Sequence, residues 1–269
     1  MSRSAIFFAG VAAFAVALLA PVPTWATAPI TAAATVQDKD KPKPEIKSMS
    51  LFTLKQGQTA TVIVYGENLA PTSVTTSKPT LTAKVLETKA TETDEAKKRG
   101  GKQTTVEVVV AGDCPPDVYE LVLVHEGDVK ATARLAVVAL AESELEVKRP
   151  CQTFAEAMPL PSIAAGWVAV NGAVMNGDSP DLFRLDAKAG ETWEITLLAG
   201  RAGSPLDPVV RIRDARRFPV ALSAGHEKRD RVLTLRAPAD GPYFIEVGDA
   251  EGRGGAQYLY RLAVRRKDK

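Results

Sequence analysis

The chain has 269 residues, and its 34 lysines and arginines nearly balance its 32 aspartates and glutamates, giving a formal net charge of +2. A molecule so close to neutral has no strong field to attract nucleic acid or an anionic surface. It has two histidines and two cysteines, and no HExxH, CxxC or Gly-x-Ser-x-Gly motif. The composition therefore argues against a zinc hydrolase and gives no support to a serine hydrolase.

The first 28 residues have the order of an export signal. A positive start is followed by the apolar run Ala5–Ala20, and small residues up to Ala28 provide cleavage sites. The run is shorter than the ~20 residues of a membrane-spanning helix. We therefore expect residues 1–28 to be a signal peptide, with no membrane span after cleavage, and the mature protein to be secreted or periplasmic. An uncleaved N-terminal anchor is the alternative, because Pro29 is a poor residue to follow the cut.

The rest of the chain divides by composition. The polar tract at 29–43 cannot bury enough apolar surface to fold, so it is predicted to be a disordered linker. About 225 residues remain, which is the usual size of two domains. The predicted boundaries are a first domain at 44–140, a semi-rigid linker at 141–160, a second domain at 161–265 and a basic tail at 266–269.

The first domain alternates apolar and polar residues with the period of β-strands. Val62 and Val64 share one strand face, and Tyr119, Leu121 and Leu123 share another. The turn residues Glu126-Gly127-Asp128 predict a hairpin between Tyr119–Val124 and Lys130–Val138. The pattern predicts an immunoglobulin-like β-sandwich.

Two segments of this domain, PEIKSMSLFTLKQGQTATVIVYGENL and CPPDVYELVLVHEGDVKATARLAV, resemble the immunoglobulin-like, plexin, transcription factor (IPT/TIG) family. The resemblance implies the same sandwich. The charged insertion Glu87–Lys102 departs from it and is expected to be a solvated loop, with a partner-binding loop as the other interpretation.

The second domain has clearer strands, with Trp193, Ile195 and Leu197 on one predicted core face and Val210 and Ile212 on another. The pattern predicts a jelly-roll-like sandwich, so the whole protein is expected to be all-β. The segments GDSPDLFRLDAKAGETWEI, GSPLDPVVRIRD, LTLRAPADGPYFIEVGD and GGAQYLYRLAV resemble the bacterial pre-peptidase C-terminal (PPC) domain of planctomycete-type secreted proteins. That resemblance implies a non-catalytic sandwich of the kind attached to secreted proteases or other exported proteins.

Some PPC relatives bind calcium, which implies candidate ligands among the acidic residues of this domain: Asp178, Asp181, Asp207 and Asp214. The family's acidic lead-in segment is replaced here by the basic Lys148–Cys151, and calcium needs six to eight oxygen ligands. Aspartates beside prolines more often build turns. We therefore expect no metal or other cofactor, with calcium as the alternative.

Candidate catalytic residues are few. His125 and His226 occur at strand ends beside charged residues, where exposure to solvent is the ordinary outcome. Acid/base chemistry on a glycan would need carboxylate pairs such as Glu142 with Glu144, or Asp249 with Glu251. Alternation and turns place these pairs in exposed positions where nothing raises a carboxylate pKa, so no enzyme activity is expected. Two aromatic residues could contact a ligand or pack in the core: Trp167 and Phe244.

Cys114 precedes the predicted hairpin, and Cys151 follows it in the linker. An antiparallel hairpin brings its two ends to the same pole of the sandwich, so a Cys114–Cys151 disulfide is plausible in an oxidising compartment. The alternative is two separate buried thiols.

Two sandwiches without a catalytic set predict an exported, non-catalytic binding or structural protein. Its expected partner is a protein or polysaccharide of the cell envelope or extracellular space, with no nucleic acid. An accessory or targeting partner of a secreted protease is the alternative, and a hydrolase with an unrecognised site is the third interpretation.

Overall fold

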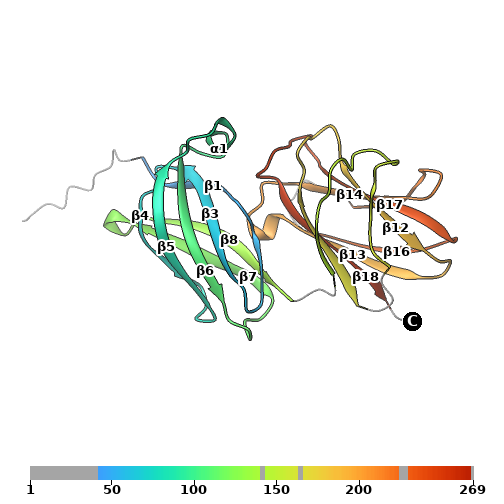
Figure 1. Cartoon of the computed structure of the whole chain (residues 1–269), viewed down its shortest axis with the longest axis horizontal. Coiled ribbons are helices and arrows are strands. Elements are labelled where there is room, and N and C mark those ends of the chain that lie inside the picture. Colours follow the sequence, from blue (N-terminus) through green and yellow to red (C-terminus); the bar gives the residue numbers. More distant parts are fainter. Residues whose placement is uncertain (1–41, 140–142, 163–165, 224–229, 268–269) are drawn as a thin grey trace, which may run out of the picture. The chain divides into compact units, whose positions relative to one another are not determined.

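The computed structural model describes residues 42–139, 143–162, 166–223 and 230–267. Their regular secondary structure is almost entirely β-strand, so the predicted all-β class is confirmed (Figure 1). They form two sandwiches, each built from two sheets. No helix among them is long and apolar enough to cross a membrane. The predicted signal peptide, most of the 29–43 linker, Glu142 and His226 lie outside the described residues.

The first sandwich pairs two four-stranded sheets. One sheet has the order β1 (Glu45–Met49), β3 (Thr59–Glu67), β6 (Lys102–Val110) and β5 (Leu81–Ala90). The other has the order β2 (Thr53–Lys55), β8 (Lys130–Val138), β7 (Asp117–His125) and β4 (Pro71–Thr76). Figure 1 shows β3, β5 and β6 side by side in the first of these sheets.

The core of this sandwich follows the alternation of the sequence. Tyr119, Leu121 and Leu123 of β7 are 4%, 0% and 0% exposed and face Val62 and Val64 of β3 within one cluster. The predicted hairpin is confirmed, because β7 and β8 pair in an antiparallel register. Burial of such side chains stabilises the fold by about 1.5–3 kcal/mol each.

The charged insertion Glu87–Lys102 is solvent-exposed over most of its length, as expected, but it is not simply a loop. Its start belongs to β5, and the short helix α1 (Asp94–Lys97) follows. Arg99 then turns inward, 8% exposed, with its guanidinium 4.1 Å from the Tyr65 ring and its Nε donating to Ser48 Oγ. Stacking on an aromatic face and hydrogen bonding compensate for burying this charge, which is why a charged sequence packs here.

The second sandwich pairs two five-stranded sheets. One has the order β10 (Met158–Pro159), β12 (Asp181–Ala187), β17 (Gly241–Asp249), β14 (Pro208–Arg213) and β15 (Pro219–Ser223). The other has the order β16 (Arg231–Arg236), β13 (Thr192–Leu198), β18 (Leu259–Lys267), β11 (Trp167–Ala173) and β9 (Ser143–Glu146). The predicted inward residues Trp193, Ile195 and Leu197 are buried between these sheets.

Two segments expected to lie outside the second domain contribute strands to it. Within the 141–160 linker, β9 pairs in parallel with β11, and β10 pairs in parallel with β12. At the other end, β18 runs to Lys267, so the first residues of the predicted basic tail are part of a strand. Arg266 and Lys267 there form ion pairs with Glu191 and Glu194 at 3.2 and 2.7 Å.

Cys114 and Cys151 are both free and fully buried, so the predicted disulfide is not formed. Cys114 packs in the core of the first sandwich, whereas Cys151 packs in the core of the second. Each thiol is part of a different hydrophobic cluster, which matches the alternative of two separate buried thiols.

Candidate ligand-binding cleft

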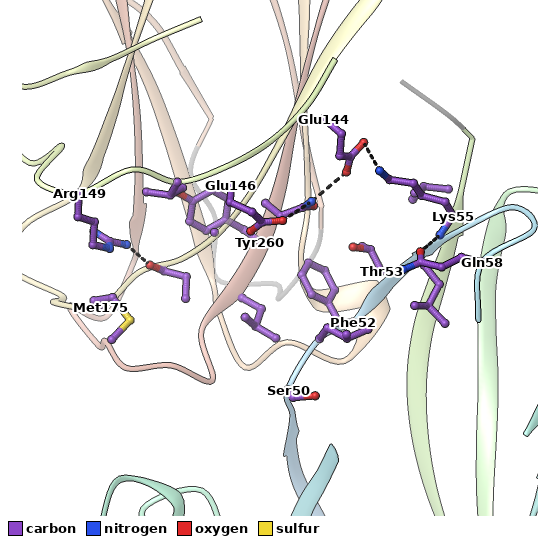
Figure 2. Close-up of a pocket in the computed structure, with 18 residues that line it drawn as sticks. Ser50, Phe52, Thr53, Lys55, Gln58, Glu144, Glu146, Arg149, Met175 and Tyr260 are labelled. Carbon is purple, nitrogen blue, oxygen red and sulfur yellow. Dashed lines mark hydrogen bonds and ion pairs between the residues drawn. The ribbon is translucent and has the colours of Figure 1, made fainter. Parts of the chain in front are cut away.

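A cleft of about 440 Å³ opens beside β9 and β11, and residues of the 50–58 segment form its other wall (Figure 2). This volume lies within the range of small-ligand sites. Its lining mixes charged, amide and hydroxyl side chains with apolar ones. The cleft therefore offers both hydrogen bonds and apolar contact to a ligand.

The polar wall is organised by Asn171 of β11. Its Nδ2 donates to Glu144 Oε1 at 2.9 Å and to Glu146 Oε1 at 3.1 Å. The two glutamates are two residues apart on β9, so their side chains lie on the same face. Glu144 also accepts from both guanidinium nitrogens of Arg261, and Lys55 Nζ lies 4.0 Å from it. Figure 2 shows Glu144 and Lys55 facing one another across the cleft.

Glu144 is fixed as an anion. Burial alone would raise its pKa, but hydrogen bonds from Arg261 and Asn171 lower it below its ordinary value. A bidentate arginine pair is among the stronger hydrogen-bonded contacts in proteins. A carboxylate held in this way lacks the raised pKa of a general acid.

Two lining residues, Arg149 and Tyr260, belong to a second network around the fully buried Asp181 of β12, which does not itself line the cleft. Arg149 donates to both of its oxygens, at 2.6 and 3.0 Å, and the Tyr260 hydroxyl donates to Oδ2 at 2.6 Å. Arg149 also donates to the carbonyl oxygen of Ala173 at 2.5 Å. The network ties β12 of one sheet to β18 of the other, so it holds the lining residues Arg149 and Tyr260 in place.

Burial and the Asp181 charge shift two pKa values in this network. Burial raises the pKa of the Tyr260 hydroxyl well above its ordinary value, and Asp181 raises it further. Burial also raises the pKa of the Cys151 thiol to about 11, with Asp181 contributing. Both groups are therefore protonated at neutral pH. Neither is activated as a nucleophile, since the thiolate and not the thiol reacts.

Apolar side chains also line the cleft. Leu51 and Leu259 line it half-buried, and Met175 at its rim is 47% exposed. Exposed methionine adapts to differently shaped ligands. The cleft thus combines a rigid polar wall with an apolar rim.

The four candidate calcium ligands have separate roles. Asp181 is held by Arg149 and Tyr260, and Asp207 pairs with Arg231 at 3.1 Å. Asp214 accepts from the backbone N–H groups of Arg216 and Phe218, and Asp178 is exposed. Over the described residues, no group of three or more histidine, cysteine or acidic side chains could hold a metal ion. Calcium binding stays a prediction that rests on the resemblance.

Two residues that were expected to be exposed to solvent, His125 and Asp249, are buried. His125 is buried rather than solvent-exposed, at 7%, with Nδ1 3.3 Å from the Val129 carbonyl oxygen, because it ends β7 against the following turn. Asp249 is also buried, and Arg253 neutralises it at 2.9 Å. Hydrogen bonds from Arg253 and from backbone N–H groups outweigh burial and lower its pKa.

The two candidate aromatic residues are packed rather than free. Trp167 is half-buried beneath the Arg261 guanidinium, at 5.5 Å. Phe244 is 9% exposed and meets the edge of Phe154 at a centroid distance of 5.0 Å. No local pattern indicates Asn171, Arg261 or Arg149 as site residues, because each lies far along the chain from its partners.

Acid should weaken this fold. Glu144 and Asp249 have lowered pKa values in the folded state, so their contribution to stability is complete above their ordinary values of 4.5 and 3.8. This contribution to stability is lost as the pH falls through the lowered pKa values of the folded state. We expect the urea midpoint to decline from about pH 5 downward, and Glu144→Gln to make that decline shallower. Urea titrations between neutral pH and pH 3 would measure it. An unchanged slope in Glu144→Gln would contradict the assignment, and Glu92→Gln, at an exposed position, is the control.

No protein-family model matches this sequence, and no curated protein is similar to it at a significant level. The chain is similar in structure to a periplasmic inhibitor of g-type lysozyme from Aeromonas hydrophila, with 16% identity and a TM-score of 0.32 over 46% of this chain and 99% of that chain. It is also similar to the pre-peptidase C-terminal domain of a Bacillus anthracis collagenase, with 13% identity and a TM-score of 0.29 over 47% of this chain and 97% of that chain.

A third similar structure is SGBP-B of the mixed-linkage glucan utilization locus of Bacteroides ovatus, in complex with a mixed-linkage heptasaccharide. It is 11% identical, with a TM-score of 0.27 over 82% of this chain and 74% of that chain. Similarity at this level does not assign a function. The IPT/TIG-like and planctomycete-type assignments stay predictions.

Proposed function

We propose that the protein is an exported, non-catalytic binding protein whose cleft holds a polysaccharide chain of the cell envelope or extracellular space. The observation that supports this best is the wall formed by Glu144, Glu146 and Asn171. Fixed carboxylate and amide groups suit sugar hydroxyls, which both donate and accept hydrogen bonds. Apolar side chains that also line the cleft, Leu51 and Met175 among them, suit the C–H face of a sugar ring.

The charges of the lining favour an uncharged ligand. The lining contains two cationic side chains, Lys55 and Arg149, and two carboxylates, Glu144 and Glu146. Lys55 lies 4.0 Å from Glu144, and Arg149 pairs with the buried Asp181, which is not part of the lining. The positive and negative charges balance, so a neutral glycan enters without leaving a buried charge unpaired.

Glu146→Ala tests this site. Glu146 is exposed, so the fold should tolerate the change, whereas a ligand hydroxyl would lose a charged acceptor. We expect about tenfold weaker glycan binding, the equivalent of ~1.4 kcal/mol. Binding would be found on an array of envelope and extracellular polysaccharides and measured by calorimetry.

Glu92→Ala, another exposed glutamate that lies outside the cleft, is the matched control and should bind as the unaltered protein does. Absence of any retained glycan, or equal binding by the Glu146→Ala variant, would count against the site. Turnover of a retained glycan would refute the non-catalytic function.

A further inference from the structure

A second interaction surface lies on the other sheet of the second sandwich, at β15. Among the residues that the structure describes, this strand is the last in its sheet and pairs there with β14 alone. Edge strands usually carry charged residues that prevent pairing with other chains. Lys84 and Lys89 do so on β5, and Glu144 and Glu146 do so on β9.

β15 has no such protection, because its sequence PVALS contains no charged residue. Ala221 packs against the core, whereas Val220 and Leu222 point away from it and are 39% and 58% exposed. Phe218, directly before the strand, is 64% exposed. Among the described residues, these are three of the eight large hydrophobic side chains that are exposed, and they lie within five positions of one another. Such clustering marks an interaction site rather than ordinary surface.

Positive charge surrounds this apolar strand. Arg211, opposite Leu222 on β14, and the neighbouring Arg213 share the single carboxylate of Glu246. Arg216 and Arg217, in the turn between β14 and β15, are exposed. Arg217 lies 4.7 Å from the Phe154 ring, which holds its guanidinium at the surface.

Glu246 belongs to the neighbouring strand β17, and the one carboxylate within the β14–β15 hairpin itself, Asp214, accepts from backbone N–H groups in the turn. Four arginines therefore face two carboxylates, Glu246 and Asp214, that are already bound. A partner with free carboxylates would complete this surface, because opposite charges attract over the Debye length.

We propose that β15 is the docking site for an extended, acidic segment of a partner protein, which adds to the free edge of the sheet as a further strand. Backbone hydrogen bonds to Val220–Ser223 supply affinity. Apolar side chains of the guest pack beside Val220 and Leu222, and its carboxylates reach Arg216 and Arg217. A second copy of this chain fits less well, because its own β15 offers no carboxylate to these arginines.

The test uses random peptides of about ten residues, displayed on phage and selected against the purified protein. We expect enrichment of peptides that combine aspartate or glutamate with β-branched residues. Hydrogen exchange in the complex should slow at the amides of residues 220–223. Enrichment of neutral or basic peptides, no enrichment at all, or protection at the cleft instead would overturn the proposal.

Two substitutions then test the apolar strand and the arginines of this surface separately. Leu222→Lys should weaken binding of the selected peptide by about tenfold or more, since it places a charge on the edge. Arg216→Glu should weaken it too and reduce its dependence on salt. Leu86→Lys, at a 49% exposed position on β5, is the control and should leave binding unchanged.

Light scattering decides between a peptide and a second copy. A protein that dimerises by itself, and becomes monomeric as Leu222→Lys, would show that the occupant is another copy of the chain and would overturn the proposal. The outcome is independent of the cleft, because none of these residues lines it.

Discussion

Asp181→Ala should lower the free energy of unfolding by about 3–5 kcal/mol, the usual cost of removing one partner of a buried ion pair. The side chain is fully buried and accepts hydrogen bonds from Arg149 and Tyr260. Arg149 is 32% exposed and can regain water after the change, but Tyr260 is fully buried and its hydroxyl is left without its acceptor. Urea denaturation at neutral pH, followed by tryptophan fluorescence, would measure the loss.

Asp178→Ala is the matched control, because this exposed aspartate lies three positions away. Its free energy of unfolding should stay within about 0.5 kcal/mol of the unaltered protein. If Asp181→Ala lowers the free energy of unfolding by less than about 1 kcal/mol, the buried network does not stabilise the fold as proposed.

Gly177→Ala should cost about 3 kcal/mol, for a steric reason. A Cβ at this position would lie 1.8 Å from the carbonyl oxygen of Gly252 and 2.7 Å from the amide nitrogen of Arg253. These are backbone atoms of a turn that Asp249 holds by accepting from the N–H groups of Glu251 and Arg253. The turn cannot move away without breaking those bonds, so the change forces two loops apart.

Gly112→Ala is the comparison for this prediction. No atom lies within 4 Å of a Cβ built there, and its φ is not in the left-handed region. The free energy of unfolding should change by no more than about 0.5 kcal/mol. Equal stabilities of the two variants, measured from their urea midpoints, would show that the loop at Gly177 yields more easily than its contacts indicate.

The strands of both cores could be predicted because their signal is local. Val210 and Ile212 alternate with arginines, and the structure buries the first pair and leaves the second on the outer face. The period of a strand is two, so four or five residues are enough to show which side faces the core.

Neither β9 nor the inward turn of Arg99 could be found in this way. The sequence SELE of β9 has no apolar alternation typical of a strand, and its pairing partners on β11 lie 25 residues further along the chain. Arg99 stands in a run of charged residues, and only the position of the Tyr65 ring shows that it packs. Such features depend on contacts between distant segments, which no local pattern records.

The cleft was missed for the same reason. Arg261 and Glu144 are 117 residues apart, and Tyr260 and Asp181 are 79 apart. The sequence pattern indicates Glu144 only as half of an exposed carboxylate pair with Glu142. An arginine inside an otherwise apolar strand, as in YLYRLAV, is the one feature of the sequence that could have suggested a buried ion pair.

The parallel pairing of β9 with β11 determines where this protein can be divided. A fragment that starts at Pro161 would lack β9 and β10, and it would also lose Arg149 and Cys151. Its sheet would end in an uncovered β11, and Asp181 would be buried without its arginine. The shortest autonomous second half therefore starts no later than Ser143, well before the change in composition that suggested a boundary.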